Sequence, residues 1–217
     1  IPDWLNLKVF ESGDAENFQV SDPDRPMTIR DLFLHTAGLT YGFQEAHPVD
    51  EIYRREGISS QGSADTLESM AAKLVDIPLQ FSPGLQWNYS IATDVLGHLV
   101  EIISGQNLEA YLQEHILTPL GMRDTGFSVK PGQEKRFAAC YLYSPCEVEV
   151  GQYYRLEDDP QCSRYLKKPS LLSGGGGLVS TIDDYYCFCK MLLNKGLSSL
   201  GVIYEKSTDY GRRFWAW

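Results

Sequence analysis

The sequence predicts an α+β fold that is mostly helical and carries one small β-hairpin. Apolar residues recur at helical spacing through most of the chain, as they do over residues 67–75. Residues 136–156 instead alternate partly between apolar and polar positions around a proline, which is typical of two paired strands. No internal repeat and no low-complexity linker interrupts the 217 residues. We therefore expect a single domain.

The first predicted helix follows Thr28, whose hydroxyl can cap its amino-terminal end. Asp31 would then lie near the positive end of the helix dipole, and Gly38 would close the helix. His35, which follows the apolar Leu34, is expected to interact with the last carbonyls of this helix rather than to act in catalysis. Three apolar residues are expected to face the core: Ile29, Leu32 and Phe33.

A second helix can begin at Asp65 or Thr66 and must end before Pro78. Its apolar residues recur every three or four positions: Leu67, Met70, Ala71, Leu74 and Val75. A later helix can begin at Asn107 and stop near Pro119. These short connections predict closely packed helices.

The segment Phe81–Ser90 supplies the candidate catalytic residue, Tyr89. Pro83 and Gly84 suit the two central positions of a type II turn, because proline presets φ and glycine accepts the positive φ that follows. Ser90 can then cap a helix over residues 91–104, which Gly105 ends. Tyr89 would thus lie just outside a helix amino terminus, held rigidly and facing a cleft. The apolar face of that helix is Val95, Leu96, Leu99, Val100 and Ile103.

The second half of the chain begins with the predicted hairpin and continues through a loop over residues 157–170. The four glycines at 174–177 lack the pattern of a phosphate-binding loop, so a tight turn or close backbone packing is the preferred interpretation. Ser180 or Thr181 can cap the last helix, which ends near Gly196. Its apolar stripe is Tyr185, Phe188, Cys189, Leu192 and Leu193. Residues 198–217 follow no period and can pack, bind a partner or be a frame-shifted end.

Composition excludes several classes of function. The net charge is −10 and no Lys/Arg-rich stripe occurs, which argues against a nucleic-acid partner. No apolar run approaches the roughly 20 residues needed to span a bilayer. Residues 1–10 lack the basic start and apolar stretch of a signal peptide, and the first residue is not methionine, which hints at truncation or processing. The oligomeric state is not predicted.

The five cysteines predict neither a disulfide framework nor a metal site. Their spacing differs from that of zinc knuckles, and the histidines lie far away in sequence. No metal and no other cofactor is therefore predicted. Cys189 falls on an apolar stripe and is expected in the core. Unpaired thiols favour a reducing compartment such as the cytoplasm.

Four segments together resemble the serine β-lactamase-related family, which contains class C β-lactamases, DD-peptidases and esterases. Residues 27–39 resemble the family's helix ending in His-Thr-Ser-Gly-Leu, and residues 81–90 resemble its Pro-Gly-x-x-(Trp/Phe)-x-Tyr-Ser block. The segments 119–126 and 173–184 match two further blocks in the same order. The resemblance covers about residues 1–196 and is closer to the esterase-like branch. It implies a serine hydrolase in which Tyr89 shares proton transfer with a lysine.

The chain also departs from that family. It contains no Ser-x-x-Lys and no late Lys-Thr-Gly or His-x-Gly, and Ile91 stands where many relatives have an asparagine. The resemblance then implies a piece from the middle of the domain, residues 1–217, with a divergent tail at 197–217 and the central antiparallel sheet largely missing. We expect exposed apolar surface and marginal stability. The predicted function is that of a fragment of a serine acyl-transfer hydrolase, inactive by itself. The longer protein would act on a small ester or amide. The alternative is a non-catalytic binding or scaffold protein of the same fold.

Overall fold

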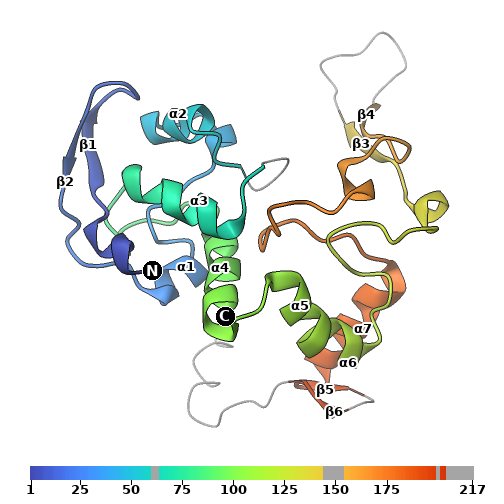
Figure 1. Cartoon of the computed structure of the whole chain (residues 1–217). Helices are drawn as coiled ribbons and strands as arrows, with labels where there is room; N and C mark the ends of the chain where they lie inside the picture. Colours follow the sequence, from blue (N-terminus) through green and yellow to red (C-terminus); the bar gives the residue numbers. More distant parts are fainter. Residues whose placement is uncertain (60–63, 144–153, 199–200, 204–217) are drawn as a thin grey trace. The chain divides into compact units, whose positions relative to one another are not determined.

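The computed structural model describes residues 1–59, 64–143, 154–198 and 201–203, which form helices and two-stranded antiparallel sheets (Figure 1). No sheet among these described residues has more than two strands. The predicted α+β class, mainly helical and without a large central sheet, is confirmed. The chain divides into two compact units. The first comprises Ile1–Tyr111 and Ser170–Gly177, and the second comprises Leu112–Pro169 and Leu178–Trp217.

The core of the first unit forms where α4 (Ala92–Ser104) contacts α1 (Ile29–Phe33) and α3 (Leu67–Lys73). In Figure 1, α4 is the upright green helix of this unit. The helix α2 (Pro48–Arg55) packs on the 3-10 turn Gly42–Gln44. Two more 3-10 turns, Pro2–Asn6 and Leu74–Asp76, contact each other.

An amino-terminal hairpin of β1 (Val9–Gly13) and β2 (Phe18–Ser21) was not predicted. Its turn is closed by Asp14, whose Oδ1 accepts hydrogen bonds from the Glu16 and Asn17 backbones. The register shifts by one residue between Phe10 and Ser12, which marks a β-bulge. A bulge breaks the strict alternation of apolar and polar residues, so periodicity alone gives a weak strand signal here.

The cap predicted for α1 is confirmed, but its buried face is narrower than predicted. Thr28 and Asp31 form a capping box, each side chain bonding the other residue's backbone N–H. Ile29 and Phe33 are 53% and 62% exposed, so the prediction that they face the core was wrong. Leu32 is buried as predicted. The first left-handed residue after the helix is His35; Gly38 also has a positive φ of 80° but lies three residues further on.

Asp31 also forms an ion pair that ties α1 to the preceding loop. Both of its carboxylate oxygens accept from the Arg25 guanidinium, at 2.7 and 2.8 Å. Its carboxylate is buried, whereas the Arg25 side chain is 43% exposed. The Arg25 hydrogen bonds, followed by those of Thr28, hold the pKa of Asp31 well below its usual range.

The cap predicted for α3 is confirmed, whereas the cap predicted for α4 is wrong. Thr66 caps α3 by accepting from the Ser69 backbone. Ser90 does not cap α4, because Ile91 occupies the N-cap position and no side chain caps that end. The polar residues Asp94 and His98 are buried on α4, while Ile103 is 77% exposed, so the apolar face differs from the predicted one. Gly105 ends α4 in the left-handed conformation, as predicted.

The next helical stretch begins where it was predicted. The Ala110 backbone N–H donates to the Asn107 side chain at 2.9 Å, which caps α5 (Leu108–Leu112). The helix continues as a π-helical turn over Gln113–Leu117 and as α6 (Thr118–Leu120). Left-handed Gly121 then ends it, two residues beyond the predicted Pro119.

A small hydrophobic core in the second unit joins α6 to α7 (Ile182–Leu193). The buried members of this cluster are Leu117, Leu120, Met122 and Met191. Thr181, one of the two predicted caps, accepts from the Asp184 backbone. Most of the apolar stripe predicted for α7 was wrong, since Tyr185, Leu193 and Cys189 are exposed and the buried residues are Asp184 and Met191. Phe188 of that stripe does pack against the cluster. The helix is followed by left-handed Gly196, as predicted.

The predicted hairpin of the second unit is confirmed as β3 (Cys140–Tyr143) paired antiparallel with β4 (Tyr154–Asp158). The strand residues that would lie at 148, 150 and 153 fall outside the described residues. The loop predicted from residue 157 begins two residues later and includes the 3-10 turn Arg164–Leu166. Another 3-10 turn, Glu134–Arg136, precedes the hairpin. A last two-residue pair joins β5 (Leu197–Ser198) and β6 (Gly201–Val202), and the rest of the predicted divergent tail lies outside the described residues.

No helix in the described part of the chain combines the length and apolar character that a bilayer span requires. Within the same residues, no group of three or more His, Cys, Asp or Glu side chains is arranged to hold a metal ion.

Candidate active site

The turn before Tyr89 has the predicted geometry. The Leu85 backbone N–H donates to the Ser82 carbonyl at 3.2 Å, and Gly84 has a φ of +92°, as the third position of a type II turn requires. Tyr89 then lies three residues before α4. The position predicted for Tyr89, just outside a helix amino terminus, is therefore the one observed.

Tyr89 lines a cavity of about 530 Å³ that lies entirely within the first unit. Its side chain is 46% exposed, so the phenol is accessible to a ligand. Arg54 brings a cation to the wall and Glu45 an anion. The remaining lining residues are small, aromatic or aliphatic: Tyr41, Gly42, Phe43, Gly57, Ile58, Ser59, Gly175 and Gly176.

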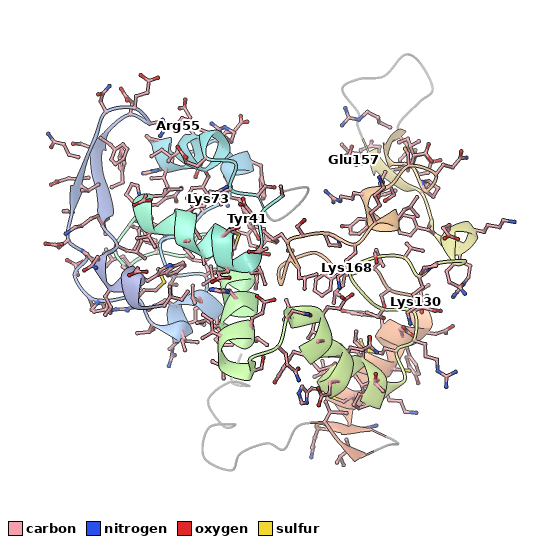
Figure 2. The ribbon with its side chains drawn as sticks, in the orientation of Figure 1. Tyr41, Arg55, Lys73, Lys130, Glu157 and Lys168 are labelled. Carbon is pink, nitrogen blue, oxygen red and sulfur yellow. The ribbon has the colours of Figure 1, made fainter. Side chains whose placement is uncertain are left out.

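Aromatic contacts surround the Tyr89 ring. The ring centroid of Tyr41 lies 5.1 Å from that of Tyr89, and Tyr41 in turn stacks on Phe43 at 4.8 Å. His35 approaches the Tyr89 ring with a centroid distance of 5.3 Å. Tyr41, labelled in Figure 2, is buried, whereas Phe43 is exposed. These contacts restrict the Tyr89 ring, which still lines the cavity.

His35 does not interact with the α1 carbonyls through its ring, so that prediction was wrong. Its Nδ1 lies 3.2 Å from the Ser90 hydroxyl, and its backbone N–H alone reaches back to the Leu32 carbonyl. Burial lowers the pKa of His35 from its usual value.

The glycine run packs against the first turn of α4. Ser173 donates its hydroxyl to Asp94 Oδ1 at 2.5 Å, and the backbone N–H groups of Gly175 and Gly176 donate to Ser173 Oγ. A Cβ on Gly174 would lie 2.5 Å from the Thr93 carbonyl oxygen. Close backbone packing is thus the reason for glycine here, as the sequence interpretation preferred.

Asp94 is a buried carboxyl beside this wall. Its Oδ2 has no hydrogen-bond partner among the described residues, and burial is the main reason that the pKa of Asp94 is raised. Burial, together with the negative field of Asp94, raises the pKa of Tyr41 well above its usual range. Tyr41 therefore stays a neutral phenol at physiological pH.

Three residues near the site were missed at the sequence level: Tyr41, Arg54 and Asp94. Asp94 carried a usable signal, because a carboxyl within an otherwise apolar helical pattern is either exposed to solvent or buried with hydrogen-bond partners. Arg54 and Tyr41 carried none, since both are separated from Tyr89 by more than 30 residues. The lysine expected beside Tyr89 is not among the described residues that line the cavity.

A family model described as Beta-lactamase matches residues 15–214. The chain belongs to this family. The esterase-like resemblance of the four sequence blocks agrees with the assignment, and so does the fold.

The chain is similar to two bacterial proteins and to one fungal enzyme of known structure. Protein Rv1367c of Mycobacterium tuberculosis is 37% identical over 195 residues, which cover 90% of this chain and 46% of the relative. Esterase EstB of Burkholderia gladioli is 34% identical over 179 residues, covering 76% of this chain and 44% of the esterase. The structure of a simvastatin synthase (LovD) mutant from Aspergillus terreus superposes with a TM-score of 0.67 at 28% identity, covering 90% of this chain and 43% of the synthase. The chain thus spans less than half the length of these relatives.

Proposed function

We propose that this chain supplies the tyrosine-bearing wall of a serine-dependent acyl-transfer site that hydrolyses a small ester or amide, with an esterase-type reaction favoured. The observation that carries the proposal is the position of Tyr89, accessible in the cavity just before α4. The named activity of EstB and the match to the esterase-like blocks support the ester substrate.

In this proposal Tyr89 transfers the proton. A phenol has a pKa near 10 in water, so it acts as a base only where a nearby positive charge favours the phenolate. As a serine hydroxyl attacks the carbonyl carbon, its proton passes to the Tyr89 oxygen. The tyrosine then returns that proton to the leaving alcohol as the ester C–O bond breaks, and water releases the acyl group by the same route.

The nucleophile in this scheme comes from outside the 217 residues, since no serine of the chain stands three places before a lysine. The cavity contributes the rest of a binding wall. Tyr41, held as a neutral phenol, and Phe43 offer an apolar face, and Arg54 offers a charge to an electronegative group. Tyr41, Phe43 and Tyr89 suit a substrate with an apolar acyl or alcohol group.

The absence of Ser-x-x-Lys favours a second function, a non-catalytic binding protein on the same fold. Sequencing the coding region on both sides of the Ile1 and Trp217 codons separates the two. An in-frame Ser-x-x-Lys upstream and a Lys-Thr-Gly or His-x-Gly downstream support the hydrolase. A start codon close to that of Ile1 and a stop codon directly after that of Trp217 would exclude the hydrolase.

Labelling with a serine-reactive phosphonate tests the same point in protein. We expect the 217-residue chain to remain unlabelled and a longer product carrying the serine to react. In that longer product Tyr89→Phe should lower the rate of ester hydrolysis, whereas Tyr185→Phe, an exposed tyrosine in the other unit, should not. Covalent labelling of the 217-residue chain would show that it holds a nucleophile we have not assigned.

A further inference from the structure

His35 adopts a backbone conformation that is uncommon for residues other than glycine. Its φ is +53°, in the left-handed region where glycine normally follows a helix. Residues in such conformations persist only where the surrounding structure holds them, and they cluster at functional sites. In this protein the conformation directs the residue toward the segment that carries Tyr89.

The contacts of His35 cover four consecutive residues of that segment. Its carbonyl accepts from the Asn88 backbone at 2.9 Å, and its Nδ1 pairs with the Ser90 hydroxyl at 3.2 Å. Its ring centroid lies 5.3 Å from that of Tyr89 and 6.2 Å from that of Trp87. The backbone, the Nδ1 atom and the ring of His35 therefore all contact the segment Trp87–Ser90.

We propose that His35 is a positioning residue, which fixes the direction of the Tyr89 ring at the cavity wall; its catalytic consequence rests on the function proposed above for Tyr89. Ser90 is buried, so its hydroxyl pairs with Nδ1 away from competing water. This bond fixes the residue after Tyr89, and the Asn88 bond fixes the residue before it. The tyrosine backbone is held on both sides, and the imidazole occupies one flank of the phenol ring.

A merely structural role in ending α1 predicts a different pattern. The helix end is already satisfied by the backbone, because the Leu34 N–H donates to the Arg30 carbonyl and the His35 N–H to the Leu32 carbonyl. Neither bond uses the imidazole. An imidazole that serves only to end the helix would leave the Tyr89 ring unaffected when removed.

The test measures the Tyr89 ring directly in the 217-residue chain and needs no catalysis. The chain is produced with ring-labelled tyrosine, and Tyr89→Phe identifies the Tyr89 signal among the 13 tyrosines. The variants are His35→Ala, which removes ring and hydrogen bond, and His35→Asn, whose amide can replace Nδ1 and which tolerates positive φ. We expect His35→Ala to shift the Tyr89 resonance, with that of Tyr185 unchanged. His35→Asn should restore part of the shift.

An unchanged Tyr89 signal in His35→Ala would overturn the proposal, and so would equal shifts at all tyrosines. If His35→Ala does not fold, Ser90→Ala decides the question, because it removes the same hydrogen bond without altering the backbone at His35. Tyr89 must then shift selectively in Ser90→Ala for the proposal to stand.

The kinetic consequence is tested separately in the longer, serine-bearing protein. Displacement of a reacting group by about 1 Å can cost on the order of 100-fold in rate, so His35→Ala should lower kcat by about 10- to 100-fold and change KM by less than about twofold. If Tyr89→Phe leaves kcat unchanged, the function proposed for Tyr89 fails, while the resonance shift in His35→Ala still reports positioning. If Tyr89→Phe is inactive and His35→Ala keeps the wild-type kcat, positioning fails and the function proposed for Tyr89 stands.

Discussion

Gly174→Ala should destabilise the first unit, because the added methyl group has no room. The new Cβ would lie 2.5 Å from the Thr93 carbonyl oxygen and 3.5 Å from Gly97 Cα, both backbone atoms of α4. Carbon and oxygen in close contact normally stay about 3.3–3.6 Å apart. Neither atom can rotate away, so the glycine-rich segment and α4 must separate by about 1 Å.

The cost follows from two effects of that separation. Forcing a methyl group into close-packed surroundings typically costs about 1–3 kcal/mol. The displacement also stretches the 2.5 Å hydrogen bond between Ser173 and the buried Asp94 carboxyl, and weakening a charged hydrogen bond adds about 1–2 kcal/mol. The expected loss is therefore about 2–5 kcal/mol in the free energy of unfolding, a large part of a typical total of about 5–15 kcal/mol.

Thermal unfolding followed by circular dichroism measures this loss. For a chain of this length about 2–4 °C of Tm corresponds to 1 kcal/mol, so Tm should fall by about 4–20 °C. Gly126→Ala is the matched control, since its nearest atom would be 3.8 Å away and its backbone needs no positive φ. A Gly174→Ala protein that melts within about 1 °C of the wild type would refute the packing argument.

Three further predictions concern charges and caps. Burial raises the pKa of Asp94, so the folded state binds the proton more tightly than the unfolded chain does. The resulting stabilisation is present below about pH 4 and is lost as the pH rises through the folded-state pKa. In urea unfolding at several pH values, Asp94→Asn should gain stability relative to the wild type as the pH rises above about 4, and a constant difference would contradict this. Asp31 has a depressed pKa, so its stabilisation is present above about pH 4 and lost as pH falls through the folded pKa. Asp31→Asn should therefore cost about 1–2 kcal/mol near pH 7, a low value because Arg25 is partly screened by solvent, and the deficit should shrink in acid. Thr181→Ala should lower the free energy of unfolding by about 1 kcal/mol, because it removes the cap of α7. Thr181→Ser keeps the hydroxyl and should keep that stability. Equal losses for the two variants in chemical denaturation would show that the cap contributes nothing.

The parts of the site that could be predicted depend on residues close together in the sequence. The Pro83–Gly84 turn and the place of Tyr89 before α4 follow from local backbone preferences, and the structure has both. Ser90 shows the limit of such reasoning. A serine before a helix is a good cap, but here its hydroxyl pairs with His35 from 55 residues away instead. A local preference worth about 1 kcal/mol is readily overridden by a buried long-range hydrogen bond.

Burial was the least predictable property. Ile29, Ile103 and Cys189 lie on apolar patterns yet are exposed, because a pattern shows which residues can pack and not whether a neighbouring element covers them. Asp94 is buried against its residue type because Ser173 and Gly175, 79 and 81 residues later, supply its hydrogen bonds.

Most helices, the cap at Thr28 and the family blocks could be predicted from the sequence alone, since each depends on residues within a few positions of one another. The helix α2 was not predicted, and the sequence left two candidates at each of the caps that the structure assigns to Thr66 and Thr181. Which helix faces are buried, and which side chains contact Tyr89, became clear from the three-dimensional packing alone. The cavity wall joins Tyr41, Tyr89 and Gly175, which are separated by 48 and 86 residues. Their encounter depends on how the helices pack, and no local signal in the chain encodes it.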